Sequence, residues 1–394
     1  MTKLIHFLEK ANEMQKVSII CFLAVLLMLV GLQVSAQYTI GTPNNALGTI
    51  TNDDFPAVSS IVRADANPTS AASIDFTVTF NVAVTGVNAA DFALTVTGTA
   101  TGTIATVTPV STTVYTVTVT NTTPSGGLGT FRLDIIDDNS IVNSGQSLGG
   151  SGAQNYTTGA VYNIDHAPPS ITSFTRKTPA TANTNASSLT FLVTFSKDVT
   201  NVGTNDFVKN TTSTTAITTV TPVTASTYDV VVSGGDLASF NGTVGIDLVA
   251  SPTIADLGGN ALPAGEPTTD ETYTLDNTAP STTSFTRKTP TTQNTTATSV
   301  TFLATFSEAV ANVDNGDFSV SGLTSATIVV TPVTTSTYDV VVSGGDIATF
   351  NGTVGLDFVA TPTIADLGGN ALPNTEPTTD ETYILDNTAP STTS

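Results

Sequence analysis

Acidic residues that could bind a cation recur with the same spacing in two short segments of the chain. Ca²⁺ takes about six to eight oxygen ligands from Asp, Glu and Asn side chains and from carbonyl groups. Crowded like charges cost stability unless a cation offsets them, which gives these residues a physical reason to bind metal. The sequence therefore predicts calcium ligands among Asp256, Asp270, Glu271, Asp276, Asn277, Asp366, Asp380, Glu381, Asp386 and Asn387.

The same acids also have an interpretation that requires no metal. Acidic turn residues raise the net charge and keep a protein surface soluble. One calcium motif is excluded from the residues alone. If Asp256 were the first ligand of an EF-hand loop, Ala261 would lie where that loop requires glycine and Glu266 would come one position too early.

Other kinds of site chemistry have little support in this sequence. Nucleophilic catalysis needs a nucleophile beside a base. His166 is the only histidine after the first 36 residues, and the two related segments have Asn277 and Asn387 in its place. Cys and His clusters with zinc spacing and phosphate-binding glycine motifs do not occur. We therefore predict a protein that is not an enzyme.

The composition points away from nucleic acid as a partner. The chain has 394 residues, with 11 Lys+Arg against 32 Asp+Glu and a formal net charge of -21. Nucleic-acid binding requires a basic face that neutralises phosphates. Hydrophobic residues make up 39% of the chain and charged residues 11%, so its segments can bury cores and need not form a disordered acidic tail.

The first 36 residues are typical of a secretory signal peptide. Three lysines precede an uncharged apolar run from Val17 to Val34, and Ala36 ends a small-residue cleavage pattern. The alternative is an uncleaved anchor, since about 18 apolar residues can just span a bilayer. Cleavage would remove Cys21, the single cysteine, and leave no membrane span. An exported acidic chain without cysteine favours a bacterial envelope or extracellular protein.

Three copies of one unit follow the predicted leader. Residues 174–179 (FTRKTP) recur at 285–290, and residues 276–280 (DNTAP) recur at 386–390. A more distant copy precedes them. We expect a linker or degenerate module end at 37–55, repeats at 56–168, 169–279 and 280–389, and the start of a truncated fourth repeat at 390–394.

Apolar and polar residues alternate within each repeat. Phe76, Val78 and Phe80 alternate with threonines, and Tyr115, Val117 and Val119 do the same. This period of two places one strand face in a core and the other in water, as in antiparallel sheets. Several short strands separated by turns in about 110 residues predict an immunoglobulin-like β-sandwich. The expected fold class is therefore all-β, with tandem Ig-like sandwiches.

Two motifs carry a resemblance to a known group. Residues 190–196 (TFLVTFS) and the loop 254–262 (IADLGGNAL) resemble the bacterial Ig-like repeats of S-layer proteins and large surface adhesins. The segment 275–280 (LDNTAP) is similar to the linkers of calcium-rigidified adhesion modules. The first repeat departs from the pattern, because it has Asn143 in place of Asp256 and Asp366.

The resemblance implies a secreted or cell-surface protein that serves as an adhesive stalk or spacer. Its partners would be the neighbouring repeats of the same chain and a surface or matrix ligand that the sequence does not identify. Calcium at the repeat junctions would stiffen such a stalk. The alternative is that the repeats are accessory modules of a secreted hydrolase whose catalytic domain lies outside this chain.

Overall fold

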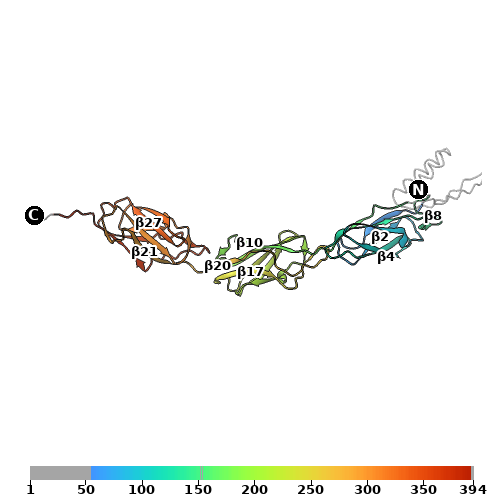
Figure 1. The fold of residues 1–394 in the computed structure, drawn as a ribbon, viewed down its shortest axis with the longest axis horizontal. Coiled ribbons are helices and arrows are strands. Elements are labelled where there is room, and N and C mark those ends of the chain that lie inside the picture. Colours follow the sequence, from blue (N-terminus) through green and yellow to red (C-terminus); the bar gives the residue numbers. More distant parts are fainter. Residues whose placement is uncertain (1–54, 151, 153, 392–394) are drawn as a thin grey trace, which may run out of the picture.

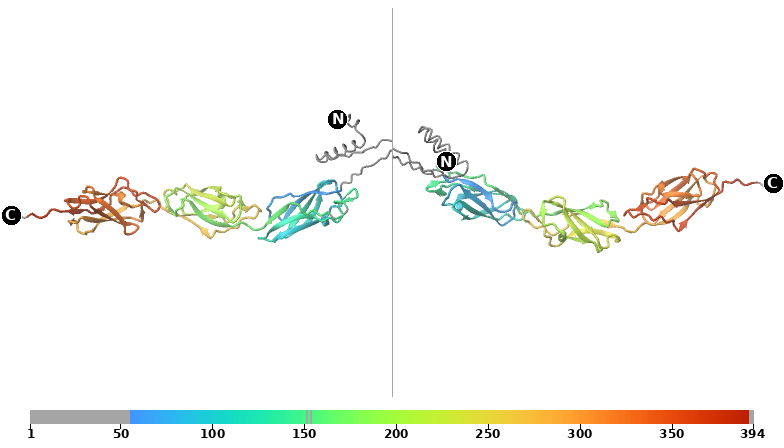
Figure 2. Two further views of the ribbon diagram at one scale, coloured as in Figure 1. Left: turned by 90° about the horizontal axis from the view of Figure 1, so that it is seen from above. Right: turned by 180° about the vertical axis from the view of Figure 1, so that it is seen from behind.

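The computed structural model describes residues 55–150, 152 and 154–391. In this part the chain forms three β-sandwiches that lie end to end in one row, with the first and third at opposite ends (Figure 1). Figure 2 shows the same elongated row from two further directions. The predicted leader, nearly all of segment 37–55 and the last three residues of segment 390–394 lie outside the described residues.

The first sandwich consists of two main sheets. One sheet has the strand order β1 (Val58–Arg63), β2 (Ser73–Phe80), β5 (Val114–Asn121) and β4 (Gly102–Pro109). The facing sheet has the order β3 (Phe92–Gly98), β6 (Leu128–Ile135) and β9 (Val161–Asp165). A small hairpin adds β7 (Val142–Asn143) and β8 (Gln146–Ser147).

The second sandwich has a five-stranded and a four-stranded sheet. The larger sheet has the order β15 (Ala216–Pro222), β16 (Thr227–Ser233), β12 (Ser188–Phe195), β10 (Ile171–Thr178) and β19 (Thr269–Asp270). The smaller has the order β11 (Asn183–Thr184), β20 (Tyr273–Leu275), β17 (Gly242–Leu248) and β14 (Phe207–Asn210). A two-stranded ladder joins β13 (Val199–Thr200) to β18 (Ala255–Asp256).

The third sandwich repeats this topology strand for strand. Its larger sheet has the order β26 (Thr327–Pro332), β27 (Thr337–Ser343), β23 (Ser299–Phe306), β21 (Thr282–Thr289) and β30 (Thr379–Asp380). Its smaller sheet has the order β22 (Asn294–Thr295), β31 (Tyr383–Leu385), β28 (Gly352–Phe358) and β25 (Phe318–Ser321). The corresponding ladder pairs β24 (Val310–Ala311) with β29 (Ala365–Asp366).

Strands dominate the described part of the chain. Its helices are three single-turn 3-10 helices: η1 (Ala89–Asp91), η2 (Thr204–Asp206) and η3 (Asn315–Asp317). No helix in this part of the chain is both long and apolar enough to span a membrane. The predicted all-β fold class with tandem sandwiches is confirmed, although the bounds of the repeats stay a prediction.

Each sandwich has a hydrophobic core of its own. Strand β12 shows why, since its burial alternates residue by residue and places Leu189, Phe191, Val193 and Phe195 inside. Phe191 packs edge-on against Tyr273 with ring centroids 5.0 Å apart, and the equivalent pair in each of the other repeats has nearly the same geometry. Separate cores allow the three repeats to act as rigid bodies that meet only at their ends.

Candidate functional site

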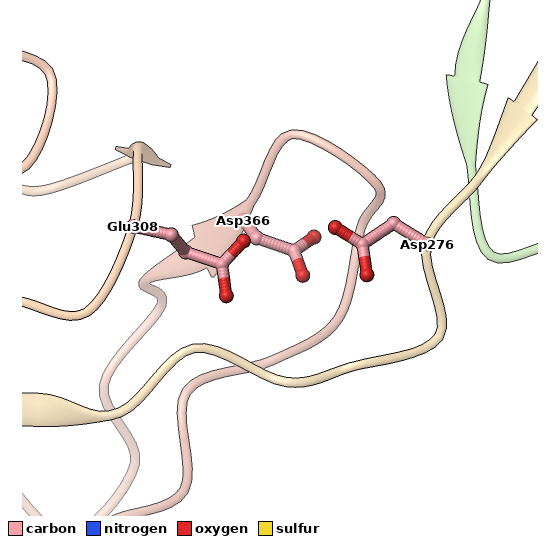
Figure 3. A group of neighbouring side chains, drawn as sticks. All are labelled: Asp276, Glu308 and Asp366. Carbon is pink, nitrogen blue, oxygen red and sulfur yellow. The ribbon is translucent and has the colours of Figure 1, made fainter. Parts of the chain in front are cut away.

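Three carboxylates from two repeats meet at the junction between the second and third sandwiches. Asp276 directly follows β20, the last strand of the second repeat, whereas Glu308 lies two residues after β23 and Asp366 ends β29. One oxygen of each carboxylate lies within 4.8 Å of an oxygen of the other two. Figure 3 shows the side chains facing one another, with Asp276 opposite the two acids of the third repeat. The junction that contains this cluster is here named the second joint.

Hydrogen bonds of Asn370 hold the second joint together. Its backbone N–H donates to Asp366 Oδ1 at 2.9 Å, and its side-chain Nδ2 donates to Asp366 Oδ2 at 2.8 Å. The same Nδ2 donates to the backbone carbonyl of Asp276 at 2.7 Å, so one amide connects the two repeats. Asn185 of the second repeat donates to Asn370 Oδ1 at 3.0 Å and adds a second bridge.

The loop before Asn370 packs closely against the linker. A Cβ at Gly368 would lie 2.9 Å from the Asp276 carbonyl oxygen and 3.1 Å from the Asp276 Cβ. Only a glycine fits here without moving the backbone. The Asp-Leu-Gly-Gly-Asn loop at 366–370 therefore has a physical role, because its first glycine lets a buried aspartate and an amide donor approach the end of the preceding repeat.

The electrostatics of the second joint are unfavourable to three charged acids. Asp366 is buried, whereas Asp276 and Glu308 are half-buried. Burial raises the pKa of Glu308 above its ordinary value, and the charges of Asp276 and Asp366 raise it further. None of the ion pairs found among the described residues involves any of the three carboxylates. Repulsion within this group would be relieved by a cation.

The junction between the first and second repeats, the first joint, has the same construction with one difference. Asp165 ends β9, Asp256 ends β18, and Lys197 lies two residues after β12. Lys197 Nζ donates to Asp165 Oδ2 at 2.8 Å, to Asp256 Oδ2 at 2.9 Å and to the carbonyl of Ala167. At this joint a lysine thus lies between the carboxylates of two repeats.

The pKa directions in the first joint agree with a neutralised group. Burial opposes ionisation of Asp256, but hydrogen bonds from Asn260 and Lys197 outweigh it and lower the Asp256 pKa. Burial likewise opposes the charge of Lys197, and its bonds to Asp165 and Asp256 prevail and raise the Lys197 pKa. Both shifts favour the charged forms, which is the electrostatic opposite of Glu308.

The structure brings together only two of the residues predicted as metal ligands. Asp276 and Asp366 share the second joint, whereas Asp256 bonds to Lys197 in the first. Glu271 and Glu381 instead pair with arginines of their own repeats, Arg176 and Arg287, at 3.3 Å each. These two glutamates connect segments within their own sandwiches and are not among the three carboxylates of the second joint.

The other predicted ligands also have local roles within their own repeats. The amides of Asn277 and Asn387 donate to backbone carbonyls in the turns before β17 and β28, for example to Phe240 and Phe350. Asp386 accepts a hydrogen bond from the backbone of Thr388. Burial raises the pKa of both Asp270 and Asp380. The charge of a neighbouring aspartate raises it further, Asp247 in the case of Asp270 and Asp357 in the case of Asp380.

Sequence reasoning missed Glu308, the third member of the cluster. It follows Phe306 and Ser307 as Lys197 follows Phe195 and Ser196, so the two residues occupy one position of the repeat. A charge reversal at one position between two nearly identical copies was the available signal. His166 is half-buried, and its Nε2 lies 2.9 Å from Asn121 Nδ2.

No protein-family model and no curated protein matches the sequence. Among solved structures, the Escherichia coli adhesin FdeC is similar with a TM-score of 0.39 and 13% identity over 83% of this chain and 96% of that one. A 1.5-MDa bacterial ice-binding adhesin is similar with a TM-score of 0.33 and 16% identity over 83% of this chain and 97% of that one. The S-layer protein rSbsC gives 0.26 and 14% over 85% of this chain and 55% of that one.

At these TM-scores the likenesses establish neither a ligand nor an activity for this chain. The solved structures that it resembles include bacterial adhesins and S-layer proteins, which is the group that the repeat motifs resemble.

Proposed function

We propose that this chain is a non-enzymatic secreted or cell-surface protein that serves as an adhesive stalk or spacer. The observation that carries the proposal is the end-to-end row of three separate sandwiches, each joined to the next by direct polar contacts (Figure 1). In such an array a repeat contacts only its neighbours, so its reach grows with copy number. The surface or matrix ligand is not identified by this geometry.

The joints support a stalk better than flexible linkers would. At the first joint the Ser70 N–H donates to the Gly258 carbonyl at 2.7 Å, and Asn260 Nδ2 donates to the Asp165 carbonyl at 2.8 Å. These bonds restrict bending between repeats. At the second joint the bond from Asn370 Nδ2 to the Asp276 carbonyl corresponds to that of Asn260.

We further propose that calcium stiffens the second joint, held by Asp276, Glu308 and Asp366. Calcium–oxygen bonds measure about 2.3–2.6 Å, so two oxygens on one ion lie at most about 5 Å apart. The oxygens of this cluster, within 4.8 Å of one another, satisfy that limit. Carboxylates are also the hard oxygen donors that Ca²⁺ prefers. Bound calcium would supply positive charge that links the second repeat to the third.

Small-angle scattering and calcium calorimetry on residues 37–394 test this proposal. We expect an elongated particle, one calcium site, and a longer, stiffer particle in millimolar calcium than in chelator. If calcium were present at about 100 times the Kd, the bound state would gain about 2.7 kcal/mol. A compact particle would contradict the stalk, whereas identical behaviour in calcium and chelator would contradict only the metal.

The alternative of accessory modules for a secreted hydrolase concerns a catalytic domain outside this chain and stays a prediction. Hydrolytic assays on the same protein test the non-enzymatic part. We expect no activity on polysaccharide or ester substrates. For ester hydrolysis the reason is that the His166 Nε2 contacts the Asn121 amide, and among the described residues its ring has no hydrogen bond to a nucleophile.

A further inference from the structure

The two joints have the same arrangement of the backbone but carry different side chains at one central position. In the first, the Asn260 N–H donates to Asp256 Oδ1 at 2.9 Å; in the second, the Asn370 N–H donates to Asp366 Oδ1 at 2.9 Å. The side-chain amides reach the linker carbonyls at 2.8 and 2.7 Å. The joints therefore offer an internal comparison in which the loop that contacts the linker is the same and the central side chain differs.

The changed position is Lys197 in the first joint and Glu308 in the second. The ammonium of Lys197 lies between two carboxylates that come from different repeats, at 2.8 Å from Asp165 and 2.9 Å from Asp256. This placement is independent of the acidic cluster in the second joint, since it involves other residues. It locates a positive charge between the aspartates that correspond to Asp276 and Asp366.

We infer that this position decides whether a joint closes by itself or depends on an external divalent cation. Lys197 is a built-in counter-ion that locks the first joint at any calcium concentration. Glu308 removes that counter-ion and adds a third carboxylate, so the hydrogen bonds of Asn370 act against like-charge repulsion and the second joint becomes stiff only when a cation such as Ca²⁺ binds. The inference rests on the calcium site proposed above and adds a regulation to it: one fixed joint and one cation-gated joint in the same stalk.

The contacts of Lys197 explain why a lysine suffices at the first joint. Its ammonium has three donors and contacts both aspartates and the Ala167 carbonyl on the linker between the repeats. An ammonium cannot take more than a few oxygens, whereas Ca²⁺ accepts about six to eight. A joint with two carboxylates suits the lysine, and a joint with three suits the divalent ion.

Reciprocal charge swaps test the inference on residues 37–394. This segment has no cysteine, because Cys21 is the only one in the sequence. Spin labels can therefore be placed at the exposed, equivalent positions Thr106 and Thr219 across the first joint, and at Thr219 and Val329 across the second. The width of each label-to-label distance distribution reports how tightly that joint is held.

In the unmodified protein we expect the first joint to give a narrow distribution in both calcium and chelator. The distance distribution across the second joint should be broad in chelator and narrow in calcium. E308K should make the second joint narrow in chelator and abolish its calcium site in calorimetry. K197E should make the first joint broad in chelator, narrow in calcium, and raise the calcium stoichiometry from one to two.

Two control variants separate the joint from general charge effects. K177E reverses a charge in the same repeat, where Lys177 pairs with Asp229 at 2.6 Å and not with the joint; both distributions should stay unchanged. E308Q removes the acid without adding a cation, so it should lose calcium binding and leave the second joint broad.

The outcomes distinguish this inference from the proposed calcium site. If the unmodified protein bound no calcium while K197E broadened the first joint and E308K narrowed the second, the calcium site would be wrong and the role of this position would stand. If the first joint responded to calcium as the second does, or if both swaps left the distributions unchanged, the inference would be overturned.

Discussion

The first and second joints share one frame and carry opposite charges at its centre. Both use an Asp-x-x-Gly-Asn loop whose asparagine bonds to the carbonyl of the aspartate at the end of the preceding repeat. Lys197 neutralises the first joint, whereas Glu308 adds a third carboxylate to the second. The comparison teaches that the geometry of a joint and the charge at its centre depend on different residues, so one can change without the other.

Removing the charge at the central position should have the largest effect on the free energy of unfolding. It should destabilise repeat 2 at the first joint and stabilise repeat 3 at the second. K197M leaves the Asp256 side chain, which is 1% exposed, without its cation. Breaking a buried pair costs roughly 3–5 kcal/mol, and because the Lys197 side chain is 28% exposed we expect repeat 2 to lose about 2 kcal/mol. E308M in chelator should instead stabilise repeat 3, since it removes a like charge.

Urea unfolding of both variants in chelator measures this contrast. K177M is the control, because it removes an exposed ion pair on the same repeat and should cost less than about 1 kcal/mol. A similar loss of stability in K197M and E308M would show that the two residues do not play opposite electrostatic roles.

Removal of the loop asparagine should reduce stability by the same amount at both joints. N260A and N370A each remove an amide that donates to a buried aspartate and to a linker carbonyl. Leaving buried acceptors without a donor costs about 1–3 kcal/mol, and we expect about 1–2 kcal/mol in each repeat because both loops keep their backbone bonds. Thermal unfolding measures the two losses, and a large loss in only one variant would mean that the joints are not equivalent.

A smaller difference should distinguish the two glycines of the frame. A Cβ at Gly368 would come within 2.9 Å of the Asp276 carbonyl, whereas a Cβ at Gly258 would meet its nearest atom, the Asp165 carbonyl oxygen, at 3.2 Å. Overpacking of this kind costs roughly 1–3 kcal/mol when the backbone must shift. We therefore expect G368A to cost about 1 kcal/mol and to broaden the second joint, and G258A to cost less. Equal broadening at both joints would contradict the tighter approach at Gly368.

Much of the fold could be predicted from the sequence because the pattern of period two is local. The alternation in residues 188–195 alone identifies which side chains are buried. Apolar differences between the second and third repeats preserve burial: the equivalent residues Leu248 and Phe358 are buried to the same degree, and Phe358 packs against Phe285 and Phe318.

The candidate site was only partly predictable, because it forms between repeats. Asp276 and Asp366 were expected from their charge, but their grouping with Glu308 depends on how two sandwiches meet end to end. Local composition made Glu271 look like a ligand, whereas its partner Arg176 lies 95 positions earlier on a neighbouring strand. A pattern of charges identifies candidates, but it does not show which of them already have a partner.

The smallest expected effect is a pH response of the first joint, and its sign follows from the two pKa directions. The folded pKa of Asp256 lies below its ordinary value of 3.8, so its contribution to stability is present above pH 3.8 and is lost as the pH falls through the folded value. The pKa of Lys197 is raised above 10.5, so its contribution is present below pH 10.5 and is lost at higher pH.

The width of the label distribution across the first joint should therefore stay constant between pH 4 and pH 10 and increase outside that range. K197M removes one of the bonds that lower the Asp256 pKa and leaves burial and Asn260 as the opposing influences. Because this variant already lacks the counter-ion of the joint, urea unfolding is the measurement for it: the acid-side loss of stability of repeat 2 should begin at a higher pH, whereas K177M should keep the original profile. An unshifted acid limb in K197M would mean that Asn260 alone keeps Asp256 ionised, and the lysine would then not be the counter-ion of the joint.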